Sequence, residues 1–117
     1  MEVKSADSKA EVMCSNSEIR EIVTLVENPR NPNAHGPEQL RLLGKIIRAT
    51  GWRAPIVVSK RSGFVVKGHG RLQAARLAGL THAPVDLQDY ATEAEEWADM
   101  VADNRIAELA EMSATEY

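Results

Sequence analysis

Short hydrophobic runs alternate along the chain with stretches rich in proline, glycine and polar residues, which is the pattern of a small α/β domain. The β-branched run 21–26 predicts a first strand, and the segment 28–33, with two prolines and three asparagines, predicts a loop after it. The apolar runs 54–58 and 64–66 predict a β-hairpin joined by a polar turn. A shorter apolar run at 85–87 predicts one further strand.

A first helix is predicted between the loop and the hairpin. Gly36, followed by proline and glutamate, favours a helix start, and Gly51 favours an end after Thr50. Helical spacing separates the intervening side chains into two stripes. The apolar stripe, which is expected to pack, contains Leu40, Leu43 and Ile47, and the basic stripe contains Arg41, Lys45 and Arg48.

Two more helices are predicted downstream. The alanine-rich stretch 72–78, closed by Gly79, has high helix propensity. Thr92 and Glu95 form a capping box that opens a last helix, which is expected to run to about Met112. Its packed side is predicted to hold Trp97, Ala98, Val101, Ala102 and Leu109, and its solvent-exposed acidic face Glu96, Asp99 and Asp103.

The chain of 117 residues suffices for one domain with a modest core. Residues 1–18 show no periodicity and are predicted to form a flexible leader, followed by the domain at 19–112 and a short tail at 113–117. No run approaches the roughly 18 apolar residues of a membrane-spanning helix, so no membrane partner is expected. The single cysteine, Cys14, excludes a disulfide framework within the chain, and we expect a cytoplasmic protein.

The charges are strongly segregated along the sequence, although the net charge is only −3. Residues 39–85 carry nine basic and no acidic side chains, whereas residues 86–117 carry one basic and ten acidic ones. The basic block suggests an anionic partner. The alternative is that the block pairs with the acidic C-terminal helix, and the sequence leaves both interpretations open.

The segment Lys67-Gly-His-Gly-Arg71 follows a predicted strand and precedes a predicted helix. Two glycines allow the backbone to approach a ligand, and a helix start offers unpaired N–H groups to a phosphate. Arg71 can add a bidentate contact, and His69 can donate a hydrogen bond or accept a proton. A tight turn that uses glycine for steric reasons alone would have the same sequence.

Two further polar segments are candidates for a ligand site. Asp103 and Asn104 interrupt the amphipathic pattern of the last helix, where they could bind magnesium or simply face solvent. Arg30 and Asn31 lie in the proline-restricted loop, which could close over a ligand or merely connect two elements. The three histidines lie far apart with no cysteine at ligand spacing, so a structural zinc site is not expected.

The order of these motifs resembles the ParB/sulfiredoxin-like family, and most closely the short ParB-like proteins of phages and mobile elements that are often labelled ParB-like nuclease domains. The resemblance covers roughly residues 19–112 and rests on three blocks: Asn28-Pro-Arg-Asn-Pro, Val65-Val-Lys-Gly-His-Gly-Arg-Leu-Gln-Ala-Ala-Arg-Leu-Ala-Gly79, and Ala102-Asp-Asn-Arg-Ile-Ala-Glu108. It implies an α+β fold with a small mixed sheet, helices packed on it and a C-terminal helix.

The chain departs from the family patterns in informative ways. His69 stands where partition proteins have glutamate in Gly-Glu-Arg-Arg, which places CTP hydrolysis by their route in doubt. The loop lacks the cysteine of the sulfiredoxin pattern Gly-Cys-His-Arg, so sulfinic acid reduction is not expected. Lys67 replaces the aspartate of the serine-kinase pattern. Of the Glu-Asn-x-x-Arg pattern of partition proteins only Asp103 and Asn104 match, because position 107 is alanine.

The resemblance implies a nucleotide-binding module, for CTP or ATP with Mg²⁺, that acts in DNA-related regulation, partition or phage processes. The expected nucleotide-binding residues are Gly68, His69, Gly70, Arg71, Asn104, Arg30 and Asn31; the expected magnesium ligands are Asp103 and Asn104; the expected catalytic residues are His69 and Asp103. One alternative is a metal-dependent nuclease that grips DNA through Arg41, Lys45 and Arg48. Another is a small-molecule kinase with Glu27 or Asp103 as base. Self-association or a protein partner also remains open.

Overall fold

The computed structural model describes residues 8–31 and 35–115, and from residue 106 onward it describes the backbone only. The elements form one mixed sheet with helices packed against it. In chain order they are β1 (Glu18–Glu21), the 3₁₀ helix η1 (Ile22–Thr24), β2 (Val26–Glu27), α2 (Pro37–Thr50), β3 (Ile56–Ser59), β4 (Phe64–Lys67), α3 (His69–Leu77), β5 (His82–Gln88) and α4 (Glu93–Thr115). The predicted α+β class with a small mixed sheet and a C-terminal helix is confirmed.

The sheet has five strands in the order β1-β5-β3-β4-β2. The hairpin pair β3–β4 and the pair β1–β5 are antiparallel, whereas β3–β5 and β2–β4 are parallel. The parallel pair β3–β5 aligns Ile56 with Val85, and both side chains are fully buried. The hairpin predicted from the runs 54–58 and 64–66 is therefore present, and the strand predicted at 85–87 is longer than expected.

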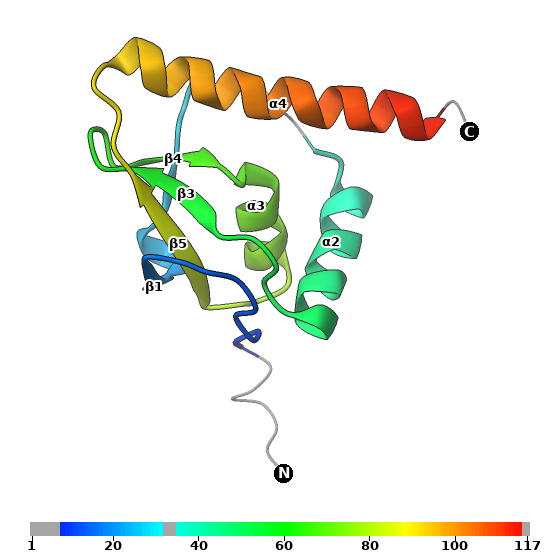
Figure 1. The fold of residues 1–117 in the computed structure, drawn as a ribbon. Helices are drawn as coiled ribbons and strands as arrows, with labels where there is room; N and C mark the ends of the chain where they lie inside the picture. Colours follow the sequence, from blue (N-terminus) through cyan, green and yellow to red (C-terminus); the bar gives the residue numbers. More distant parts are fainter. Residues whose placement is uncertain (1–7, 32–34, 116–117) are drawn as a thin grey trace.

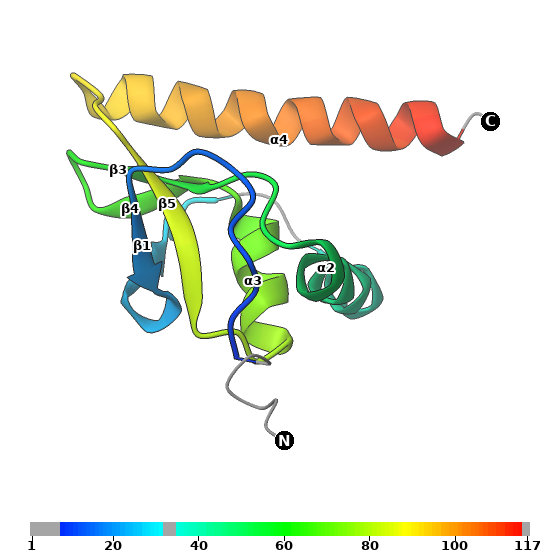
Figure 2. The same cartoon turned by 60° about the horizontal axis from the view of Figure 1, so that its bottom comes forward.

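The helices occupy two positions relative to the sheet. Figures 1 and 2 show α2 and α3 lying side by side, while α4 spans one end of the molecule beside the β3–β4 hairpin. The described part of the chain contains no helix with the length and hydropathy needed to cross a membrane.

The packed stripe predicted for α2 is confirmed, because Ile47 is buried and Leu40 and Leu43 are partly buried. Gly44 lies on the same side and lets α2 approach α3 closely. A Cβ atom at Gly44 would lie 2.9 Å from the backbone oxygen of Ala74. This close approach holds α2 against the helix that follows the glycine loop.

The single strand predicted at 21–26 is wrong. This run is divided into the end of β1, the turn η1 and the two-residue strand β2. β1 and β2 lie at opposite edges of the sheet, so the chain must turn between them despite its β-branched residues. Ile22 and Leu25 are buried by this turn, whereas Val23 is 87% exposed.

The flexible leader predicted at 1–18 is only partly compatible with the structure. Residues 1–7 lie outside the described residues, but residues 8–17 are joined to the domain by backbone hydrogen bonds. The Met13 N–H donates to the Trp52 carbonyl at 2.8 Å, and the Trp52 backbone N–H donates to the Glu11 carbonyl at 2.7 Å. Gly51, with φ +85°, permits this contact because a Cβ atom there would lie 2.8 Å from the Glu11 oxygen.

The predicted faces of the last helix are also wrong in part. Glu96 and Met100 are buried at 2% and 1% exposure, whereas Ala98, Val101 and Ala102 are exposed. Leu109 lies where the structure describes only the backbone. α4 therefore packs through a partly acidic face, and its helix continues to Thr115, past the predicted start of the tail at residue 113.

Candidate functional site

A pocket of about 210 Å³ lies between the start of α3 and the middle of α4. It is lined by His35, Leu43, Gly68, His69, Gly70, Arg71, Asp103 and Asn104. These residues come from the end of the polar loop, from α2, from the glycine loop and from α4. The structure thus brings together the glycine loop at 68–71 and the Asp103–Asn104 segment, which are more than thirty residues apart in the sequence.

Gly68 forms the N-cap of α3 and has the left-handed backbone conformation, with φ +93°. A side chain here would be strained and would also contact Arg71, because a Cβ atom would lie 3.1 Å from its Nη2 atom. α3 starts at His69, three residues earlier than the predicted stretch 72–78, so Gly70 and Arg71 belong to its first turn. The N-terminal end of α3, with its partly positive dipole, therefore borders the pocket.

Arg71 is held deep in the site. Its Nη2 atom donates a hydrogen bond to the Pro55 carbonyl at 3.0 Å, while its Nε atom is buried and has no hydrogen-bond partner among the described residues. Burial lowers the pKa of the Arg71 guanidinium, and the nearby Asp103 carboxylate opposes that shift. An arginine in this setting keeps its charge. The guanidinium is thus a half-buried cation that borders the pocket, with an Nε–H group that has no partner among the described residues.

His69 is 5% exposed, and its Nε2 atom accepts a long hydrogen bond of 3.4 Å from the Asn28 N–H. This contact requires the neutral tautomer with its proton on Nδ1. Burial lowers the pKa of His69, although Glu27 and Asp103 act in the opposite direction. His69 is therefore a neutral side chain near pH 7 that ties the polar loop to the glycine loop.

His35 is a site residue that the sequence reasoning missed. Its imidazole lies against Gly70, where an added Cβ atom would be 3.0 Å from Nε2 and 3.1 Å from Cε1. His35 also contributes to lowering the pKa of His69. The only sequence signal for it was a histidine between the polar loop and the following helix, which no spacing rule connects to the glycine loop.

The polar loop and α4 meet through two asparagines. The Nδ2 atom of Asn104 donates to the Oδ1 atom of Asn31 at 3.1 Å, and the Asn31 N–H donates to the Asn28 carbonyl at 3.0 Å. Asp103, next to Asn104, lines the same pocket. Asn31 is therefore placed beside one of the predicted magnesium ligands.

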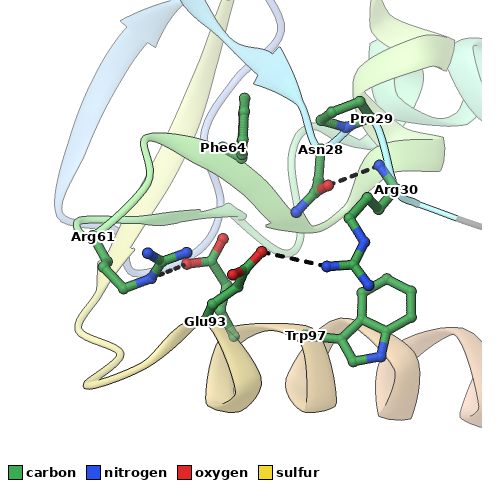
Figure 3. A pocket seen from close by; sticks show the side chains of 8 residues that line it. Asn28, Pro29, Arg30, Arg61, Phe64, Glu93 and Trp97 are labelled. Carbon is green, nitrogen blue, oxygen red and sulfur yellow. Dashed lines mark hydrogen bonds and ion pairs between the residues drawn. The ribbon is translucent and has the colours of Figure 1, made fainter.

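Arg30 does not line this pocket, and Figure 3 shows its guanidinium beside Trp97 and Glu93. Its guanidinium lies 4.5 Å from the centre of the Trp97 ring and 3.3 Å from the Glu93 carboxylate. These contacts line a separate hollow of about 80 Å³ on the outer side of the loop. In this structure Arg30 fastens the loop to α4 and does not line the 210 Å³ pocket.

The basic stripe predicted for α2 lies on a different surface, where Arg41, Lys45 and Arg48 border a hollow between α2 and α3. Other basic side chains pair with the acidic segment after residue 85. The pairs are Lys60–Asp89 at 3.7 Å, Arg61–Glu96 at 3.2 Å and Lys67–Asp99 at 3.2 Å. Among the described residues, the acidic segment thus neutralises part of the basic block at the β3–β4 hairpin, whereas on α2 Arg41 pairs with Glu38 at 3.1 Å.

Comparison with known proteins identifies the family. The model of the ParB N-terminal domain matches residues 2–111. The ParB-like nuclease domain-containing protein YnaK of Escherichia coli K12 is 33% identical over 55 residues, which cover 47% of this chain and 62% of that protein.

Solved structures show the same fold. The C-terminally truncated chromosome-partitioning protein ParB from Caulobacter crescentus, complexed with CTP-gamma-S, has a TM-score of 0.63 and 28% identity, and the match covers 75% of this chain and 53% of that one. A Pnob8-like ParB-N domain has a TM-score of 0.56 and 17% identity, over 70% of this chain and 32% of that one, which shows the fold alone. This chain therefore spans less than two thirds of each relative. With the family model matched over nearly its whole length, the chain belongs to the ParB N-terminal domain family.

Proposed function

We propose that this domain binds a nucleoside triphosphate, with CTP the first candidate, and uses it to regulate a DNA-related process. The observation that carries the proposal is the convergence of the α3 N-terminus, the half-buried Arg71 guanidinium and the Asp103–Asn104 pair on one pocket. A helix start and an arginine supply positive potential and N–H donors to phosphate oxygens. The Caulobacter relative bound to CTP-gamma-S supports the choice of CTP over ATP.

Asp103 and Asn104 suit a magnesium ion that arrives with the nucleotide. Mg²⁺ is commonly held by one or two protein oxygen ligands together with phosphates and water. The hydrogen bond to Asn31 uses the Nδ2 atom of Asn104, so its Oδ1 atom is the one that could face a cation. The described residues contain no group of three or more His, Cys, Asp or Glu side chains that could bind a metal by themselves.

In this proposal Gly68 and Gly70 let the phosphates approach the backbone, and Arg71 neutralises their charge. His69, neutral and bonded to Asn28, holds the polar loop in place. It also offers no carboxylate to activate a water molecule, so we propose binding with slow turnover, as a switch requires. Arg30 and Asn31 contribute by holding the loop beside α4.

The test is titration calorimetry with CTP, ATP and ADP, each with and without Mg²⁺. Arg71→Ala should weaken binding by about ten- to a hundredfold, because it removes charge-assisted hydrogen bonds to phosphate. Arg53→Ala is the matched control, since Arg53 is exposed and bonds only to the Thr50 carbonyl near the end of α2. Absence of saturable binding to any nucleotide at millimolar concentration would refute the proposal.

A nuclease remains the second candidate because the E. coli relative carries that description in its name. This activity would require metal and DNA at the same pocket, with Asp103 as the carboxylate and His69 assisting. Cleavage of plasmid DNA that is abolished by chelation and by Asp103→Asn would favour it. Phosphate transfer to a small hydroxyl compound, measured in parallel with labelled ATP, would instead indicate a kinase.

A further inference from the structure

A second surface lies outside the nucleotide pocket, in the angle between α2 and α3. A hollow of about 200 Å³ is bordered by three cationic side chains of α2, and its other walls come from α3. These walls are formed by Ala74 and Leu77 of α3 and by its C-cap residue, Ala78. This surface therefore combines an apolar floor with a basic edge.

Large apolar side chains stand on both sides of the basic edge. Leu77, in the hollow, is 54% exposed. Leu42, which shares a neighbouring hollow with Arg41 and Lys45, is 60% exposed. Exposed leucines beside cations are typical of a surface that is covered by a partner.

The sequence supplies little negative charge beside this surface. No carboxylate occurs between residues 39 and 85. Glu38, at the start of α2, lines the neighbouring hollow and pairs with Arg41 at 3.1 Å. Arg48 donates its hydrogen bonds to the Ala78 carbonyl, which fixes it along the rim. Among the described residues no carboxylate forms an ion pair with Lys45. The charge of Lys45 is thus available to a partner.

We propose that this surface docks an acidic, amphipathic segment of another protein. Its carboxylates would pair with Arg41 and Lys45, one apolar side chain would enter the hollow beside Leu77, and a second would cover Leu42. A DNA backbone would supply the negative charge but would leave both leucines uncovered, because phosphates contribute no apolar surface. The surface is separate from the nucleotide pocket, so this proposal does not depend on nucleotide binding.

The probe is a fluorescein-labelled peptide of about 15 residues, built from glutamate, leucine and alanine as an acidic amphipathic helix. Fluorescence anisotropy should show saturable binding that Lys45→Gln weakens about fivefold and Leu77→Gln about tenfold. Lys60→Gln removes the same charge at the β3–β4 hairpin and should have no effect. A peptide in which alanine replaces every leucine should bind at least tenfold more weakly.

Three results would overturn the proposal. If the protein binds a DNA duplex but not the peptide, and Lys45→Gln abolishes that binding, this result would assign the surface to nucleic acid. Concentration-dependent dimerisation in sedimentation experiments that Leu77→Gln abolishes would assign it to a second copy of this chain. Peptide binding that is insensitive to both Lys45→Gln and Leu77→Gln would place the binding site elsewhere. Circular dichroism of each variant confirms that the fold is retained.

Discussion

Asn104, on α4, donates a hydrogen bond to the side chain of Asn31, which lies 73 residues earlier in the chain. This bond joins the polar loop to α4 beside the proposed nucleotide pocket, which Asn104 lines. Both side chains are only partly buried, so the bond contributes little to overall stability. Its main effect is to fix the position of the polar loop relative to Asp103 and Asn104 on α4.

The first prediction concerns this bond. Asn31→Ala removes the connection but keeps the Asn104 oxygen, and we expect it to weaken nucleotide binding about threefold. Asn104→Ala removes both the hydrogen bond and the side-chain oxygen. It should therefore weaken nucleotide binding about tenfold and make the binding less dependent on Mg²⁺. Calorimetry on the two variants measures the difference, with the exposed Asn16→Ala as control. Equal affinities in all four proteins would contradict this role.

The second prediction concerns His35 and Gly70. An added methyl group in Gly70→Ala would lie 3.0 Å from the His35 ring, so the ring must shift by a few tenths of an ångström at the edge of the pocket. We expect nucleotide affinity to fall about tenfold, while the melting temperature changes little because the ring is at the edge of the pocket. The double variant His35→Ala/Gly70→Ala should recover part of the loss. If it recovers none, the methyl group obstructs the ligand directly and His35 is not responsible.

The third prediction concerns the close contact between α2 and α3. Gly44→Ala would place a methyl group 2.9 Å from the Ala74 carbonyl of α3 and 3.1 Å from the methyl group of Ala78, the C-cap residue of that helix. Because the nearest atom belongs to the backbone, relief requires the helices to separate, which we expect to cost about 1–3 kcal/mol of unfolding free energy. Urea denaturation measures this loss. Gln39→Ala is the control, since Gln39 is exposed on the same helix and alanine favours helix formation.

Sequence periodicity correctly predicted the elements whose buried side is marked by a local pattern of apolar residues. Local patterns predicted the apolar stripe of α2, the β3–β4 hairpin, and the order of strand, glycine loop and helix. The candidate site segments 68–71 and 103–104 were also predicted from local sequence, and the fold places them on one pocket. These features depend on neighbours close in the sequence.

The errors share one physical cause, which is a partner distant in the sequence. The run 21–26 is β-branched, but the edge positions of β1 and β2 force a turn within it. The contact of Arg30 with the Trp97 ring of α4 was likewise not predicted, because the two residues are far apart in the sequence. The His35 ring can lie against α3 because Gly70 has no side chain there. No local pattern contains such information.

Glu96 is the clearest of these cases and provides the last prediction. It was expected on the exposed face of the last helix, but it is 2% exposed and accepts hydrogen bonds from Ser59 and Ser62, each at 2.6 Å. Burial raises the pKa of Glu96, but these two bonds and the Arg61 charge together lower it below the ordinary value of 4.5. The folded protein therefore favours the ionised form.

Because the pKa of Glu96 is lower in the folded than in the unfolded chain, the unfolded chain binds more protons below about pH 4.5. The stabilisation by Glu96 is fully present above that pH and is lost as pH falls through the folded-state value. Glu96→Gln should lower the unfolding free energy at pH 7 by about 1–3 kcal/mol and flatten the decline below pH 4.5. Chemical denaturation from pH 3 to 7 measures both effects, with the exposed Glu21→Gln as control. A parallel decline in Glu96→Gln and the wild type would show that other carboxylates cause the acid sensitivity.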